Sequence, residues 1–129
     1  MALNDARVMP TIAVSDMGKA KEFYEGKLGL TGGEEQPDGG TQYPCGGGSV
    51  IHVYPSPANA GKSGATLASF EVDDVENRVN ELASAGVSFE QYDLEEIKTD
   101  DKGIASLGED QVAWFKDPDG NVMSVWHRS

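Results

Sequence analysis

Few residues in this chain of 129 are suited to chemistry, since it has only two histidines and one cysteine. His52 stands two positions before Tyr54 in a run of strand-forming residues, so their side chains would share one strand face. An imidazole placed there could act as a general base, although a histidine in a strand more often is only hydrogen-bonded or solvated. Ser124 has no matching aspartate and histidine, so a nucleophilic serine is not indicated.

The cysteine count and the charge narrow the classes of function. Cys45 has no partner for an internal disulfide, and metal motifs built on cysteine pairs are excluded by count. The formal net charge is −12, with 22 acidic against 10 basic residues. The Lys and Arg clusters that bind nucleic acid are absent. Such an acidic surface serves solubility and could also attract a cationic ligand.

The N-terminal sequence and the hydropathy bear on location. No basic stretch followed by an apolar run begins the chain, and no apolar run approaches the roughly 20 residues of a membrane span. We therefore expect a cytoplasmic protein that does not bind membranes. One domain is expected at this length, with a core that needs no disulfides.

The elements that must position the chemical residues come in two similar copies. In the first copy, a strand-like run leads through Ser15 and Asp16, either of which can cap a helix, into an amphipathic helix over residues 17–26. In the second, 58 residues later, a similar run leads through Asp74 into a helix over residues 75–84. Aspartate is a typical residue before the first turn of a helix. A repeat of this size predicts a pseudo-symmetric domain whose halves share a cleft.

The remaining elements complete a β-α-β-β-β order in each half. Strands are predicted at residues 8–14, 41–44, 49–54, 65–72, 87–92, 111–115 and 121–127. A short or irregular strand is expected within 31–40, and the acidic stretch 93–110 is expected to be a solvated flap. The first half covers about residues 7–54, a linker about 55–64 and the second half about 65–128.

Several segments together resemble the vicinal oxygen chelate superfamily, which includes glyoxalase I, extradiol dioxygenases, fosfomycin-resistance transferases and bleomycin-resistance proteins. They are the two strand-to-helix junctions, residues 28–30 and 85–87 after the helices, and the Phe-Lys-Asp-Pro-Asp-Gly-Asn sequence at 115–121. The resemblance covers essentially the whole chain. It implies an α+β fold of two βαβββ modules that form a U-shaped mixed sheet around a central cavity. The helices would lie on the outer face, and a homodimer commonly completes the assembly.

In metal-dependent members the resemblance implies four ligands, one from each of four strands. The corresponding positions here are Met9, His52, Leu67 and Ser124. A catalytic divalent ion needs several N, O or S ligands and one open position. Methionine is a soft ligand, leucine has no donor atom, and a serine hydroxyl is a poor substitute for a carboxylate. We therefore expect no metal and no other cofactor.

Strand alternation indicates which side chains line the cleft instead. The predicted lining is mostly apolar and aromatic, with few polar groups, which is typical of a small-molecule pocket. It consists of Met9, Thr11, His52, Tyr54, Leu67, Ser69, Trp114, Ser124 and Trp126.

Two classes of function follow. The first is a metal-free protein of the glyoxalase/bleomycin-resistance type that sequesters a small, aromatic or cationic ligand. The second is a lyase, isomerase or dioxygenase-type enzyme of the same superfamily, with His52 as base or as sole remaining metal ligand. The sparse polar lining favours binding, because proton transfer needs side chains within hydrogen-bond reach of the substrate. We expect a homodimer, since a single chain would leave aromatic and strand-edge surface open.

Overall fold

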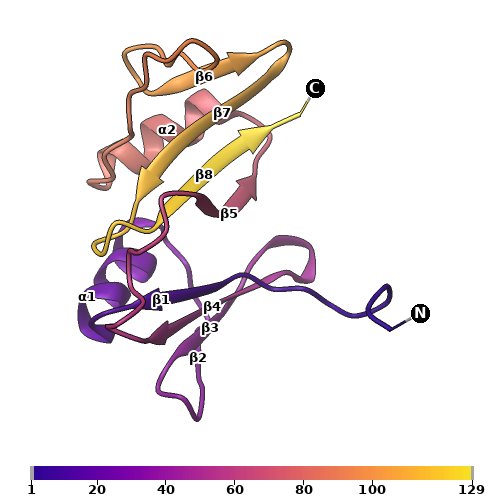
Figure 1. Cartoon of the computed structure of the whole chain (residues 1–129), viewed down its shortest axis with the longest axis vertical. Coiled ribbons are helices and arrows are strands. Elements are labelled where there is room, and N and C mark those ends of the chain that lie inside the picture. Colours follow the sequence, from indigo (N-terminus) through magenta and orange to yellow (C-terminus); the bar gives the residue numbers. More distant parts are fainter. Residues whose placement is uncertain (1, 129) are drawn as a thin grey trace.

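Two βαβββ modules make up the fold in the computed structural model, which describes residues 2–128 (Figure 1). The elements of the first module are β1 (Thr11–Val14), α1 (Met17–Lys21), the π-helix η1 (Glu22–Lys27), β2 (Glu34–Glu35), β3 (Thr41–Pro44), the short 3-10 helix η2 (Gly46–Gly48) and β4 (Val50–Pro55). Those of the second module are β5 (Thr66–Glu71), α2 (Val75–Ser84), β6 (Ile104–Leu107), β7 (Asp110–Lys116) and β8 (Val122–His127).

Each module forms a four-stranded mixed sheet with the same topology. The strand orders are β1-β4-β3-β2 and β5-β8-β7-β6, and the pairs β1–β4 and β5–β8 are parallel. The register repeats as well. Thr11 lies opposite His52, and Ser69, which follows Thr11 by 69 − 11 = 58 residues, lies opposite Ser124. The predicted α+β class and the pairing of two βαβββ modules are therefore confirmed.

The same 58-residue offset appears at the helix starts. Asp16 and Asp74 are the N-caps of α1 and α2, with φ and ψ of −144° and 115° in one and −143° and 103° in the other. Asp16 accepts from the amides of Gly18 and Lys19, and Asp74 from that of Asn77. Such caps satisfy free amides and each contribute about 0.5–2 kcal/mol. No helix within residues 2–128 is long and apolar enough to cross a membrane.

A single hydrophobic core joins the two modules. Residues of each sheet that face the helices are buried, as for Ile12 and Val14 in β1. The π-helix η1 packs against the second sheet, where the Phe23 ring lies 6.2 Å from that of Phe115. The wider turn is visible in the bond from the Leu28 amide to the Phe23 carbonyl, five residues back. The opposite faces of the two sheets are left without helices (Figure 1).

The turn at residues 117–121, the most family-like segment of the sequence, ties the modules together. The Tyr24 hydroxyl donates to Asp117 at 2.7 Å, and both residues are buried. Asp119 accepts from the amide and from the hydroxyl of Ser15, at 3.0 and 2.5 Å. The segment therefore has a structural function, because its carboxylates are committed to the first module.

One predicted strand starts too early, another does not form, and the first helix, predicted over residues 17–26, ends one residue later. The first strand begins at Thr11 and not at residue 8, because the residues before it form an arm that leaves the sheet, in which Val8 is 90% exposed (Figure 1). Residues 87–92 form no strand and make only an isolated bridge from Phe89 to Phe115. The first helix continues to Lys27 as η1.

The acidic stretch 93–110 is also more ordered than the predicted flap. It contains β6, which pairs with β7 and takes the place after α2 in the β-α-β-β-β order that was predicted for a strand at 87–92. Ile104 and Ala105 of β6 are buried and lie opposite Ala113 and Val112. The charges around this short apolar segment hide its strand character in the sequence.

Candidate functional site

The helix-free face of the second sheet holds the aromatic residues of the predicted site. Directly opposed residues of an antiparallel pair point to the same face. The opposed pairs of β7 and β8 on this face are Val112–Trp126, Trp114–Ser124 and Lys116–Val122. Phe115 is buried on the other face, in the core. Ser69 of β5 extends the row because it lies opposite Ser124.

A cavity of about 410 Å³ opens on this face. Ser69, Trp114, Ser124 and Trp126 all line it, and they come from three neighbouring strands. The guanidinium carbon of Arg128 lies 5.3 Å from the centroid of the Trp126 ring, within cation–π distance. The structure therefore brings these four predicted residues into one site that contains both tryptophans, which we call the tryptophan cavity.

The lining of the tryptophan cavity contains six polar or charged residues among ten: Thr66, Ser69, Asp110, Gln111, Ser124 and Arg128. Ser124 is 2% exposed, and its hydroxyl donates to that of Ser69 at 2.8 Å. The cavity also has one acidic and one basic side chain, Asp110 and Arg128. This lining can hold an aromatic molecule and orient it by a small number of hydrogen bonds.

The helix-free face of the first sheet has a polar residue at the position where the second sheet has a tryptophan. Gln42 lies opposite His52 in the place that Trp114 takes opposite Ser124. His52 Nε2 lies 2.8 Å from Asp38 Oδ2, and the imidazole stacks on Tyr54 with ring centroids 5.7 Å apart. The Nδ1 atom of His52 is buried and has no hydrogen-bond partner among residues 2–128. His52 and Tyr54 therefore do not line the tryptophan cavity.

Asp38 is the partner of His52 that sequence reasoning missed. It lies in the turn between β2 and β3, within the Gly-rich stretch 31–40, and also accepts from the Gly40 amide at 2.8 Å. The Gly40 amide and, after it, His52 hold the pKa of Asp38 below its usual range. The Pro-Asp-Gly-Gly sequence could have indicated the turn, but not the histidine that the turn would meet.

The other predicted lining residues lie apart. Met9 belongs to the arm before β1, is 41% exposed, and lines a cavity of about 300 Å³ with Arg7, Gln42 and Val50. Thr11 is exposed at the start of β1. Leu67 falls at the register shift of β5 and packs against the core. Thr66 lines the tryptophan cavity in its place.

The residues at the four metal positions of the family do not fit a divalent ion. The Ser124 hydroxyl is bonded to Ser69 and His52 Nε2 to Asp38, while Met9 and Leu67 offer a thioether and no donor at all. Within residues 2–128, no group of three or more His, Cys, Asp or Glu side chains could hold a metal ion. The side chains at these positions are therefore unsuited to hold a catalytic divalent ion.

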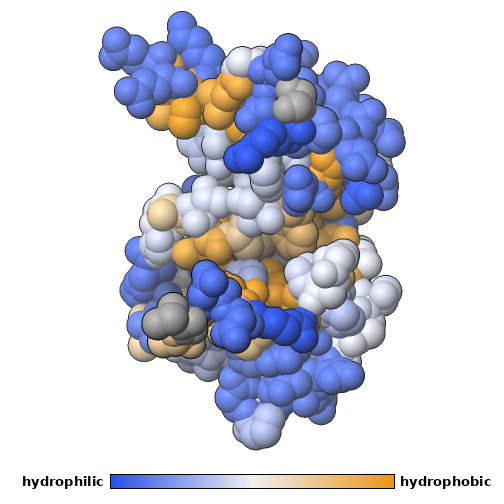
Figure 2. All heavy atoms as spheres, turned by 90° about the vertical axis from the view of Figure 1, so that its right-hand side faces the viewer, coloured by the Kyte–Doolittle hydropathy of each residue, from blue (hydrophilic) through white to orange (hydrophobic). Residues whose placement is uncertain are grey.

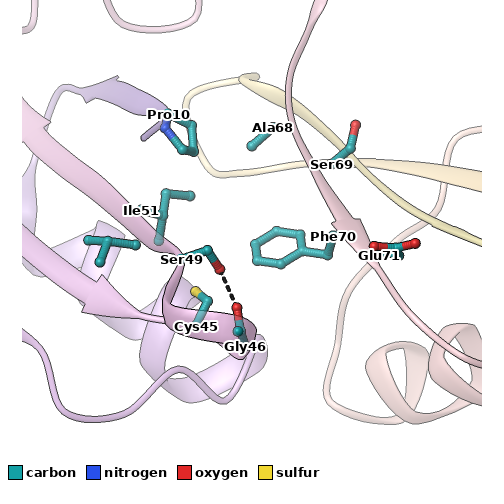
Figure 3. Close-up of a pocket in the computed structure, with 11 residues that line it drawn as sticks. Pro10, Cys45, Gly46, Ser49, Ile51, Ala68, Ser69, Phe70 and Glu71 are labelled. Atoms are coloured by element: carbon teal, nitrogen blue, oxygen red, sulfur yellow. Dashed lines mark hydrogen bonds between the residues drawn. The ribbon is translucent and has the colours of Figure 1, made fainter. Parts of the chain in front are cut away.

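A larger cavity, of about 520 Å³, lies at the junction of the modules (Figure 3). Ile51 of the first module and Phe70 of the second lie on opposite sides of it, with Cys45 and Gly46 beside them (Figure 3). Apolar side chains on this face of the molecule gather between the two modules (Figure 2). Burial raises the pKa of the Cys45 thiol, which disfavours the reactive thiolate.

Paired modules with open faces opposite their helices define the class of this protein. The chain belongs to the Glyoxalase/Bleomycin resistance protein/Dioxygenase superfamily, whose family model matches residues 6–125. No curated protein matches the chain.

Solved structures share the fold along nearly the whole chain. TnmS3, an antibiotic binding protein from Streptomyces sp. CB03234, is 24% identical with a TM-score of 0.67, over 98% of this chain and 99% of that one. A putative glyoxalase family protein from Bacillus anthracis is 19% identical with a TM-score of 0.71, over 94% and 93%. The fosfomycin resistance protein FosX from Listeria monocytogenes is 12% identical with a TM-score of 0.70, over 98% and 96%.

Proposed function

We propose that this chain is a metal-independent binding protein that sequesters a small aromatic molecule in the tryptophan cavity. The observation that carries the proposal is that Trp114 and Trp126, on neighbouring strands, line one cavity of about 410 Å³. That volume falls within the roughly 300–1,000 Å³ of small-molecule sites. Aromatic pairs contribute about 0.5–1.5 kcal/mol beyond the burial of their area.

Two further observations support binding over catalysis. The side chains at the family's metal positions cannot replace the ligands of a catalytic ion. TnmS3, which has the same fold, is described as an antibiotic binding protein.

The net charge of −12 would attract a cationic aromatic ligand over long range. The lining of the cavity itself has one acidic and one basic residue, Asp110 and Arg128, and so favours neither a cationic nor an anionic ligand.

An enzyme of the same superfamily is the alternative, with His52 as its base. A general base must come within hydrogen-bond reach of the proton that it removes. His52 Nε2 is bonded to Asp38, and Nδ1 is buried. Catalysis by His52 would therefore require the turn that contains Asp38 to move away.

We also propose a cytoplasmic homodimer. The apolar side chains of Val8, Met9 and Leu107 are 90%, 41% and 49% exposed, and β2 is an edge strand of its sheet. Pairing two chains would cover some of this surface. Sedimentation at micromolar concentration should show a species of twice the chain mass, and a monomer would contradict the proposal.

Fluorescence titration tests the binding function directly, because Trp114 and Trp126 are the two tryptophans of the chain. Uncharged aromatic probes such as phenylnaphthylamine should quench this emission saturably. A probe panel that leaves the emission unchanged up to the solubility limit would contradict the proposal. Turnover of any compound that His52→Ala abolishes without loss of binding would establish the enzyme instead.

A further inference from the structure

A second cavity of about 430 Å³ lies beside the tryptophan cavity on the same sheet face. The pair Lys116–Val122 follows the pair Trp114–Ser124 along β7 and β8, so the two cavities are neighbours on one face. Tyr92 lines the second cavity and meets the Trp114 ring edge-on, with centroids 5.5 Å apart. The two cavities therefore lie next to each other on one sheet face, with the Tyr92–Trp114 contact between them, and we call the two together the groove.

The linker between the modules closes the far end of this groove. Gly61 has a φ of +67° and donates its amide to Asn121 Oδ1 at 3.1 Å. A Cβ at this position would collide with the carbonyl oxygen of Asp119, so the close approach requires glycine. The fixed loop places the next residue, Lys62, at the wall of the second cavity.

This end of the groove has excess positive charge in a strongly acidic chain. The ion pairs formed within residues 2–128 do not include Lys62. The Lys116 ammonium lies 3.4 Å from the Glu90 carboxylate. The carboxylate of Asp119, in the adjoining turn, is bonded to Ser15. The lining of the cavity therefore contains two lysines and no acidic residue, and the pairing of Lys116 with Glu90 leaves one positive charge in excess.

We propose that the second cavity is an anion subsite, and that the ligand is an aromatic compound with a carboxylate, sulfonate or similar oxyanion at one end. The aromatic body would lie on the two tryptophans, and the oxyanion would lie between Lys62 and Lys116. A lysine ammonium binds oxyanions as a compact point charge with three donors. This inference rests on the proposed function, since it assigns the chemistry of the same ligand.

Two matched fluorescent probes test the subsite, because anilinonaphthalene sulfonate and phenylnaphthylamine differ only in the sulfonate group. We expect the sulfonated probe to bind more tightly. Lys62→Gln should weaken its binding about three- to fivefold, which is the effect of one exposed charge interaction. Binding of the uncharged probe should not change, and Lys62→Arg should retain the wild-type affinity for both probes.

Lys19→Gln is the control, because it makes the same change in net charge on α1, in the other module. If Lys62→Gln and Lys19→Gln weaken the sulfonated probe equally, the effect belongs to the overall field and the subsite is refuted. If Lys62→Gln leaves both probes bound as in the wild type, the subsite is refuted while the binding function stands. If neither probe binds the wild type, the binding function fails and the subsite with it.

Discussion

The hydroxyl of Tyr24, on the first module's helix, donates to the carboxylate of Asp117 in the second module across 2.7 Å. Asp117 also accepts from the side-chain amide of Asn121, which in turn donates to the backbone carbonyl of Ala13. All three side chains are buried. The contact joins the helix of the first module to the turn at residues 117–121 of the second. It therefore helps to fix the orientation of the two helix-free sheet faces relative to each other.

Removing this hydroxyl should destabilise the protein. Tyr24→Phe would leave a buried carboxylate without one of its donors, which costs about 1–3 kcal/mol. Urea unfolding followed by circular dichroism measures the loss. Tyr43→Phe is the matched control, because the Tyr43 hydroxyl bonds the exposed Glu25. An equal loss of unfolding free energy in the two variants would show that the Tyr24–Asp117 contact stabilises the fold no more than the Tyr43–Glu25 contact does.

The same contact predicts a pH dependence. Burial and, after it, the Asp117 carboxylate raise the pKa of Tyr24 above its ordinary value of about 10. Above about pH 10 this tyrosine ionises in the unfolded chain and stays protonated in the folded one. The folded state then binds more protons, so stability should fall as the pH rises. The decline should be less steep in Tyr24→Phe, and parallel curves for the two proteins would contradict it.

Local patterns in the sequence predicted the elements well where the deciding residues are close along the chain. Asp16 and Asp74 mark both helix starts, because an N-cap needs only the amides two or three residues ahead. His52 and Ser124 also occupy equivalent positions of the two sheets, because they lie opposite Thr11 and Ser69, which are related by the 58-residue offset.

Contacts between distant residues could not be predicted in this way. The bond of Asp38 to His52 depends on where the β2–β3 turn folds, and the close approach of Gly61 to the 117–121 turn joins segments 60 residues apart. The burial of Ile104 depends on β7, and the acidic residues around it conceal that strand. These features decide which predicted site residues share a cavity.

The Asp38–His52 bond should control access to the imidazole. Asp38→Ala removes the acceptor at Nε2, so histidine modification by diethylpyrocarbonate should become several-fold faster. His127 provides a background signal, and its contribution can be subtracted with a His52→Gln variant. A rate unchanged by Asp38→Ala would show that the turn does not shield His52. Catalysis by His52, the alternative function, would then not require this turn to move away.

The metal positions lead to a prediction about composition. Protein purified without chelators should contain no stoichiometric Mn, Fe, Ni or Zn, because Met9, Leu67 and Ser124 cannot replace the family's ligands. Elemental analysis by mass spectrometry measures this. One tightly bound ion per chain would overturn the metal-independent function, and the ligands would then have to be sought outside these positions.

The aromatic wall should dominate affinity for the ligand. Trp126→Ala removes a ring from the tryptophan cavity, so aromatic probes should bind about two- to tenfold more weakly, as expected for about 0.5–1.5 kcal/mol of lost aromatic contact. Emission from Trp114 still reports binding in that variant. Tyr54→Leu is the control, because Tyr54 stacks on His52 in the other module. If Tyr54→Leu weakens the probes as much as Trp126→Ala, the loss is not specific to the tryptophan cavity, and the proposed site is contradicted.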